Sequence, residues 1–193
     1  MSCVLPVVEG QSEVESIPLL LRRLFERQQR YDIKVHPPIR VHRYKVVRPG
    51  EWENVIYTFG GECCAVLLLL DADDDYPAEL GKDLISRAKG ARPNVGCHVV
   101  IAKKELEAWL IAAIESLKGH RGIPSNVTIP PDPEAIRDAK RWLTEHMENR
   151  NYHEVTDQPA LIAKFDIDLA CRNSPSCDKF VRVVDAILKA ITP

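Results

Sequence analysis

Short apolar runs without charge alternate with segments of helical periodicity along the first half of the chain. Two of these runs, 3–8 and 65–70, are each followed directly by a carboxylate, and a third run of similar character covers 95–102. Uncharged runs of this length, bounded by turn or polar residues, are typical of strands covered on both faces of a parallel sheet. The β-rich stretch 33–47 is interrupted by a Pro-Pro pair, which predicts an edge strand or two short pieces.

Helical periodicity follows the apolar runs. Near the first helix, Ser12 and Glu15 are spaced like a capping box, while Pro18, which fits only in or near a first turn, makes Ser16 a competing cap. The alternation of strands and helices predicts an α/β domain with a mostly parallel sheet flanked by helices. The segments with apolar residues at helical spacing are the one after Gly10, 103–117 and 178–191.

Length and composition favour a single domain. The chain has 193 residues, of which 45% are hydrophobic and 28% charged, and a chain of this size can bury about 70% of its unfolded surface. We therefore expect one domain over 1–193, with a core at about 3–120 and a helical C-terminal extension at about 121–193. The longest apolar run is far shorter than the roughly 20 residues of a membrane span, and the N-terminus lacks the pattern of a secretory signal. These features predict a cytoplasmic protein without membrane contact.

The six cysteines fit neither a CxxC motif nor the spacing of a zinc template. Cys63 and Cys64 are adjacent, which hinders a disulfide between them, and both lead into an apolar run. Buried free thiols are the preferred interpretation over redox or metal roles, which is consistent with a reducing compartment.

The formal net charge of −2 is the sum of two opposed blocks. Residues 22–48 contain nine basic and two acidic side chains, whereas residues 51–79 contain eight acidic and no basic ones. A basic block beside an acidic block suits an enzyme that binds a polyanion with one region and metal cations with the other. Two solvated faces that compensate each other are the alternative.

Carboxylates follow the first two apolar runs, where side chains line the binding crevice of an open parallel sheet. Alternate residues of an extended strand lie about 6.6 Å apart and face the same way, so Asp71 and Asp73 are expected to point to one side. Two charges at that separation repel by roughly 3 kcal/mol at an intermediate dielectric, which a cation offsets most simply. The oxygen-only set of Glu9, Asp71 and Asp73 favours Mg²⁺ or Mn²⁺.

Asp74 and Asp75 have a more ordinary interpretation. Acidic runs after strands are often loops with helix caps, and Asp75 stands directly before Tyr76, where an N-cap is expected. We therefore expect Asp71 and Asp73 to be the metal ligands, while a loop-and-cap role for the whole run stays the alternative.

A Glu-Gly after the first run, Glu9-Gly10, and a later run that ends in Asp-x-Asp at 71–73 form a pattern that resembles the Toprim fold. Topoisomerases, primases and overcoming-lysogenization-defect nucleases share that fold, and Glu13 matches a second acidic position of the nuclease branch. Further motifs make the chain similar, nearly end to end, to an uncharacterised Toprim-like family, domain of unknown function 4276. These motifs lie at 105–109, 157–161 and 172–176.

The resemblance implies Mg²⁺- or Mn²⁺-dependent phosphodiester chemistry on nucleic acid, in the manner of a nuclease that often works beside an ATPase partner. Glu9, Asp71 and Asp73 would hold the metal and carry catalysis, and Glu13 would complete a second metal site or orient its ligands. Two ions can stabilise both the attacking and the leaving oxygen. The chain lacks a Tyr placed for strand passage and the modules of primases. The lysine that stabilises the transition state in nuclease relatives has three candidates, Lys103, Lys104 and Lys164.

Other charged residues carry weaker signals. Glu105 and Glu107 diverge by about 200° on the expected helix, so they are not expected to face one point. With Asp75, they are candidates for supporting the metal ligands, and Glu105 also favours the helix dipole. Four basic side chains of the expected edge strand are candidates for phosphate binding, with edge protection as the alternative. They are Arg40, Arg43, Lys45 and Arg48.

Two other functions stay open. A metal-dependent phosphatase acting on small phosphate esters, of the haloacid-dehalogenase type, would also place Asp-x-Asp after an apolar strand, with the first Asp as nucleophile. Here the Thr or Val of that motif is missing, and the motif lies far from the N-terminus. The second alternative is a non-catalytic Toprim-like subunit that docks on a partner.

Overall fold

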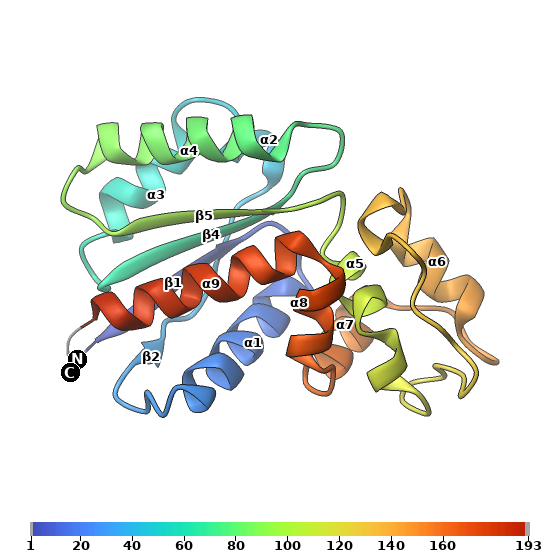
Figure 1. Cartoon of the computed structure of the whole chain (residues 1–193). Helices are drawn as coiled ribbons and strands as arrows, with labels where there is room; N and C mark the ends of the chain where they lie inside the picture. The colour runs from blue at the N-terminus through green and yellow to red at the C-terminus, as the bar shows by residue number, and fades with distance from the viewer. Residues whose placement is uncertain (1, 192–193) are drawn as a thin grey trace.

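The computed structural model describes residues 2–191, and in it a parallel sheet lies between two layers of helices (Figure 1). The strand order is β2-β1-β4-β5, with β3 also pairing with β1, and every pairing is parallel. The predicted α/β class with a mostly parallel sheet is therefore confirmed. The strands are β1 (Cys3–Val8), β2 (Lys34–Val35), β3 (Ile39–Arg40), β4 (Ala65–Asp71) and β5 (Cys97–Ala102).

Alternate residues of each strand pack under different helices, because successive side chains of a strand point to opposite faces. In β4, Leu67 and Leu69 belong to the core under α1 and α9, whereas Leu68 and Leu70 belong to the core under α3 and α4. Both faces of the sheet are thus buried, which explains the uncharged apolar runs. The four layer helices are α1 (Glu13–Arg27), α9 (Pro175–Ala190), α3 (Glu51–Phe59) and α4 (Pro77–Ala91).

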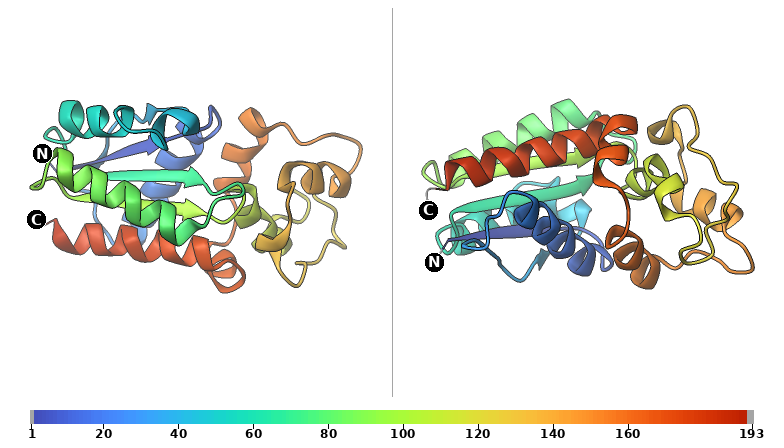
Figure 2. Two further views of the ribbon diagram at one scale, coloured as in Figure 1. Left: turned by 90° about the horizontal axis from the view of Figure 1, so that it is seen from above. Right: turned by 60° about the horizontal axis from the view of Figure 1, so that its bottom comes forward.

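The helices between β5 and α9, with the loops that join them, lie where the strands end. Figures 1 and 2 show α5 to α8 beyond the carboxyl ends of β4 and β5, whereas α9 returns along the sheet. The helical extension expected at 121–193 therefore includes one helix that completes a layer of the core. No helix within 2–191 is long and apolar enough to cross a membrane. The remaining helices are α2 (Arg43–Val46), α5 (Glu107–Ala112), α6 (Ala139–His146), α7 (Glu154–Ile162), α8 (Ile167–Asn173) and two short 3-10 turns.

Pro6 lies inside the central strand β1, a position that a proline seldom takes because it cannot donate to the ladder. The carbonyls of Val4 and Val8 accept hydrogen bonds from the N–H groups of His36 and Val41. The backbone N–H and C=O groups of the even-numbered residues of β1 therefore point toward β2 and β3. The missing N–H of Pro6 therefore points to the interval between those two short strands. The predicted split of the stretch 33–47 into two pieces is confirmed there.

Two local predictions for this part of the chain are wrong. Ser12 holds the expected N-cap position of α1, but its hydroxyl makes no capping bond, and the Glu13 carboxylate accepts the N–H groups before the helix instead. The helix also runs through Pro18 in its second turn, so Ser16 is not its cap. Beyond β3 the chain forms helix α2 instead of continuing as an edge strand. The guanidinium of Arg43 explains this local change, since it bonds the carbonyls of Asp71 and Ala72 at the end of β4.

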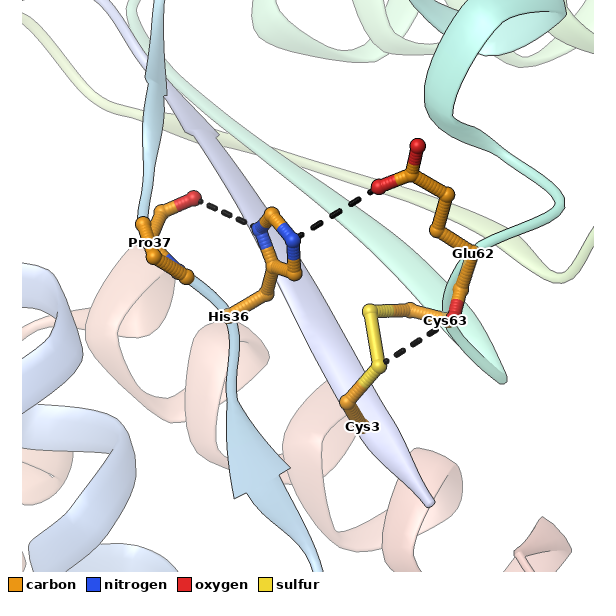
Figure 3. The surroundings of a disulfide bond; sticks show 5 residues. All are labelled: Cys3, His36, Pro37, Glu62 and Cys63. Carbon is orange, nitrogen blue, oxygen red and sulfur yellow. Dashed lines mark hydrogen bonds and ion pairs between the residues drawn. A yellow bond between two sulfur atoms is a disulfide. The ribbon is translucent and has the colours of Figure 1, made fainter. Parts of the chain in front are cut away.

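Cys3 and Cys63 form a disulfide, contrary to the expectation of free thiols (Figure 3). Cys3 begins β1 and Cys63 shortly precedes β4, and the parallel pairing of these strands brings the two Cα atoms to 4.8 Å. Beside them the His36 ring lies between the Pro37 carbonyl at 2.9 Å and the Glu62 carboxylate at 3.6 Å. Cys64 is also not a buried thiol, since it is exposed. These cysteines no longer support the inference of a reducing compartment.

An ion pair joins α3 to α4 and gives a pH-dependent prediction. Arg87 binds both carboxylate oxygens of Glu53 at 2.6 and 2.8 Å, and this hydrogen-bonded pairing lowers the pKa of Glu53 to about 2. A depressed folded-state pKa means that the stabilisation is present above the ordinary value of 4.5 and is lost as pH falls through about 2. Glu53→Gln is expected to lower the free energy of unfolding at pH 7 by about 1–2 kcal/mol.

The measurement is urea unfolding of wild type and Glu53→Gln across this pH range. The gap between the two proteins should narrow steadily as the pH falls below 4.5. Glu148→Gln, at an exposed position after α6 and outside any helix, is the matched control and should unfold like wild type. A gap that stays constant with pH would show that the stabilisation does not come from the ionised pair.

Candidate functional site

Carboxylates from three neighbouring strands meet at one edge of the sheet. Glu9 directly follows β1, Asp71 is the last residue of β4, and Glu105 and Glu107 follow β5. Because the strands are parallel, their carboxyl ends lie at the same edge, and this is where α5 to α8 cover the sheet (Figure 1). We call Glu9, Asp71, Glu105 and Glu107 the carboxylate cluster.

Lys140 of α6 inserts its ammonium among these carboxylates. Its Nζ atom lies 3.7 Å from Glu105 Oε2, 3.5 Å from Glu107 Oε2 and 3.6 Å from Glu154 Oε2. Burial alone would lower the pKa of Lys140, but Glu107, Asp71 and the other carboxylates outweigh it and hold the pKa above its usual value. A lysine that stays charged therefore balances part of the negative charge.

Glu107 is the most firmly held member of the carboxylate cluster. Only 1% of its surface is exposed, and its Oε1 atom accepts hydrogen bonds from the Tyr152 hydroxyl and the Gln158 amide, both at 3.1 Å. Gln158 is fixed in turn by the Ser16 hydroxyl at 2.7 Å. One side of the Glu107 carboxylate is thus positioned by a buried network, and its other oxygen faces Lys140.

Three buried carboxylate oxygens lack a conventional partner. Within residues 2–191, Glu9 Oε2, Glu105 Oε2 and Glu107 Oε2 are enclosed and accept no hydrogen bond. Buried polar atoms are nearly always hydrogen-bonded, so each exception requires an explanation, and an unlocated water or ion is among the usual ones. The Lys140 ammonium lies near two of these oxygens, those of Glu105 and Glu107, whereas no ion pair reaches Glu9 Oε2 among residues 2–191. This edge of the sheet is therefore a place for positive charge that Lys140 fills only in part.

Glu13 and Asp71 are closely enclosed beside these oxygens. The Glu13 Oε2 atom accepts the N–H groups of Glu9 and Gly10, both at 3.0 Å, and burial raises the pKa of Glu13 to about 7. Asp71 Oδ1 accepts the Leu106 N–H at 2.9 Å. Burial and the charges of Glu13 and Glu107 raise the pKa of Asp71 well above its usual value. Burial, with Asp73, also raises the pKa of Glu9.

Asp73 does not share the direction of Asp71, contrary to the expectation for an extended strand. Strand β4 ends at Asp71, and Asp73 takes a left-handed backbone conformation with φ of 50°. Its carboxylate is 59% exposed and lies 3.3 Å from Arg43. The neighbouring loop after β5 also bends through a left-handed residue, Lys104, which donates to the Asp73 carbonyl at 3.0 Å. The loop after β4 and the loop after β5 therefore stabilise each other's turn.

The rest of the acidic run is occupied by ion pairs. Asp74 pairs with Lys104 at 3.2 Å and with Arg137 at 2.9 Å, and Asp75 pairs with Arg43. The expected N-cap role of Asp75 is wrong, because Tyr76 holds the N-cap position of α4.

The expectation that Glu105 and Glu107 face different points is also wrong. Helix α5 begins only at Glu107, so Glu105 lies in the turn before it and the helical angle between them does not apply. Both carboxylates reach Lys140 instead.

The four basic candidates do not share one strand, because α2 replaces most of the expected edge strand. Arg40 alone lies on a strand, where it bonds the Glu9 carbonyl at 3.0 Å. Arg43 and Lys45 lie on α2, and Lys45 pairs with Glu51 at 3.4 Å. Arg48 follows α2 and is exposed.

Two cavities open beside the carboxylate cluster, and Asp73 lines both. The larger, of about 560 Å³, is walled by Asp74, Lys104, Glu105 and Arg137. The smaller, of about 410 Å³, contains Glu9 together with basic and aromatic side chains of the α2 region, among them His42, Tyr44 and Arg48. The cluster is therefore reached from two sides.

Comparison with known proteins gives a family for this chain and a solved structure with a similar fold. Residues 8–185 match the family described as Domain of unknown function (DUF4276). The chain belongs to the DUF4276 family. Among solved structures it is similar to the C-terminal region of the Burkholderia pseudomallei OLD protein, with a TM-score of 0.51 and 18% identity over 97% of this chain and 99% of that one. That likeness concerns the fold. The comparison with curated proteins found no match.

The donor set of this DUF4276 protein suits a hard divalent cation. Carboxylate oxygens are the ligands that Mg²⁺ and Mn²⁺ prefer, and those of Glu9, Glu105 and Glu107 are buried without hydrogen bonds. Among residues 2–191, no group of three or more His, Cys, Asp or Glu side chains is spaced to hold an ion as it stands. Since Lys140 lies among the carboxylates, ion binding requires some of these side chains to rotate.

Sequence reasoning missed Lys140 and the network behind Glu107. Of the three candidate lysines, Lys103 and Lys164 are exposed, and Lys104 binds Asp74 and the Asp73 carbonyl. Lys140 lies far along the chain in a helix that the local pattern does not mark as special. Only the packing of α6 against α5 brings it to the cluster.

Proposed function

We propose that this DUF4276 protein cleaves phosphodiester bonds of nucleic acid with the help of Mg²⁺ or Mn²⁺. The observation that carries the proposal is the set of three buried carboxylate oxygens without hydrogen bonds, on Glu9, Glu105 and Glu107, at the carboxyl edge of a parallel sheet. Two cavities beside them give access to an extended substrate. The motif resemblance to Toprim nucleases points to the same chemistry.

Each side chain of the site then has a distinct part. Glu9, Asp71 and Glu105 would hold the cation, with Asp73 at the rim where Arg43 now pairs with it. Glu107, fixed by Tyr152 and Gln158, keeps one oxygen directed at the same place. The bound ion would stabilise charge on the phosphate oxygens and help a water to lose its proton.

Lys140 suits the stabilisation of negative charge that builds up on the phosphate in the transition state. Its ammonium is already held near the carboxylates at 3.5–3.7 Å and needs no further ordering to act on a neighbouring anion. We assign to Lys140 the part that the resemblance expected of Lys103, Lys104 or Lys164.

Incubation of the purified chain with labelled oligonucleotides tests the proposal. Single-stranded and duplex substrates are followed on denaturing gels in Mn²⁺, in Mg²⁺ and in EDTA, and cleavage is expected only with a metal. A parallel reaction with p-nitrophenyl phosphate distinguishes the phosphatase alternative, since a nuclease should leave that small ester largely unchanged. Metal-dependent hydrolysis of the small ester without cleavage of the oligonucleotides would contradict the proposal.

Two observations favour a second candidate, a non-catalytic subunit. Lys140 already balances carboxylates of the cluster, and the described residues hold no ready-made metal site. In that case the cluster would be a structural ion-pair network. Isothermal titration calorimetry separates the two, because a metal-dependent nuclease should release or absorb heat at millimolar Mn²⁺ and a structural network should not.

A further inference from the structure

The smaller cavity joins two kinds of surface. One wall is acidic and contains Glu9 and Asp73 of the proposed site. A second wall comes from the α2 region and contains His42, Tyr44 and Arg48. A ligand that fills this cavity of about 410 Å³ would touch both walls at once.

The α2 wall offers a flat aromatic surface. Tyr44 is 57% exposed, and its ring stacks on that of His42 with centroids 5.8 Å apart and planes 17° apart. Tyr31, Tyr57 and Tyr76 are also exposed, so exposure by itself decides nothing. Tyr44 differs from Tyr57 in that it lines a cavity shared with candidate catalytic carboxylates.

Arg43 fixes the distance between the aromatic surface and the carboxylates. It lies between His42 and Tyr44 in the chain, and its guanidinium bonds the Asp71 and Ala72 carbonyls at 3.1 Å each. Its side chain is only 16% exposed. Arg43 therefore serves as an anchor for α2 and is not free to bind a substrate phosphate.

Arg48 is the free cation of this wall. Within residues 2–191 its guanidinium makes no hydrogen bond or ion pair, and it is exposed at the cavity. A phosphate bound there would lie on the same ligand as a base stacked on Tyr44. Aromatic rings interleaved with basic side chains are the usual surface for single-stranded nucleic acid.

We propose that the cavity binds single-stranded nucleic acid, with an unpaired base stacked on Tyr44 and a neighbouring phosphate at Arg48. In a duplex the faces of the bases are covered by their neighbours, so a ring such as Tyr44 reaches only an unpaired or displaced base. This deepens the proposed function and rests on it for the path of the strand toward Glu9.

Fluorescence anisotropy in EDTA at low salt tests the proposal without any need for metal or cleavage. The probes are a fluorescein-labelled oligothymidylate of about 15 nucleotides and a hairpin duplex of the same length. The single strand is expected to bind more tightly than the duplex. Tyr44→Ala should weaken its binding about 5- to 150-fold, whereas Tyr44→Phe, which keeps the ring, should bind like wild type.

Two further variants sharpen the result. Tyr57→Ala removes an even more exposed tyrosine that does not line the cavity, and it should leave binding unchanged. Arg48→Gln should reduce the salt dependence of binding by about one released counterion.

Equal binding by Tyr44→Ala and wild type, or an equal loss in Tyr57→Ala, would overturn the proposal. Tighter binding of the duplex would do the same. If the wild-type chain binds the single strand through Tyr44 but does not cleave it with a metal present, the result would count against the nuclease function alone.

Discussion

Replacing Asp71 by Asn is expected to remove metal-dependent cleavage and to make the metal-free protein more stable. Asp71 is enclosed near Glu9, Glu13 and Glu107, and both burial and these charges raise its pKa, so its ionised form is held at a cost. An amide keeps the oxygen that accepts the Leu106 N–H but removes the negative charge. Functional sites often carry such a cost in stability.

Asp71→Asn is expected to change cleavage and stability in opposite directions. The cleavage rate should fall by more than about a thousandfold, since the cation loses a charged ligand and the phosphate loses the stabilisation that the cation supplies. The free energy of unfolding in EDTA should rise by about 0.5–2 kcal/mol. Gel assays in Mn²⁺ give the first quantity, and urea unfolding in EDTA gives the second.

Asp168→Asn is the matched control, because Asp168 is exposed on α8, pairs with Arg27 and lines neither cavity. It should change neither quantity by much. An Asp71→Asn protein that is less stable than wild type in EDTA would show that Asp71 stabilises the fold rather than the site. Full cleavage by that variant would contradict the nuclease proposal.

Lys140→Gln is expected to have the opposite effect on stability and a similar effect on activity. Its loss leaves Glu105, Glu107 and Glu154 without their shared counter-charge, and the free energy of unfolding in EDTA should fall by about 1–3 kcal/mol. Lys140 is 40% exposed, so the figure lies below that for a fully buried pair. The cleavage rate should fall by about 10²–10³-fold, the usual effect of removing one group that stabilises transition-state charge.

Metal binding separates these two roles of Lys140. Without the competing ammonium, Lys140→Gln should bind Mn²⁺ at least as tightly as wild type in calorimetry, and Mn²⁺ should restore much of its lost stability. Lys179→Gln, an exposed position on α9, serves as the control and should behave like wild type. A Lys140→Gln protein that cleaves at the normal rate would remove Lys140 from the mechanism while leaving the carboxylates in place.

The strands could be read from the sequence because their environment imposes a strict pattern. A strand with helices on both faces excludes charge until it reaches its end, so the runs at 3–8, 65–70 and 95–102 are uninterrupted. The split of the edge was also readable, since two prolines cannot support a continuous ladder. Helix α2 could not be predicted from the sequence. Its composition is β-rich, and the contacts of Arg43 with the end of β4 are formed only in the folded chain.

The sequence predicted only part of the candidate site. Glu9 and Asp71 stand at strand ends, and a parallel sheet must bring such ends together. The orientation of Asp73 depends on a left-handed turn shared with the loop after β5, which no local pattern reveals. The disulfide of Cys3 likewise follows from strand register and not from cysteine spacing.

The sequence by itself determined the parallel α/β sheet and the edge at which its carboxylates collect, because burial and strand direction act on neighbouring residues. Only the tertiary structure decided what surrounds that edge. Lys140, Tyr152 and Gln158 reach Glu107 from segments more than thirty residues away along the chain. Their positions depend on how helices beyond residue 120 pack on α1 and α5, and packing between distant segments leaves no period or spacing in the sequence.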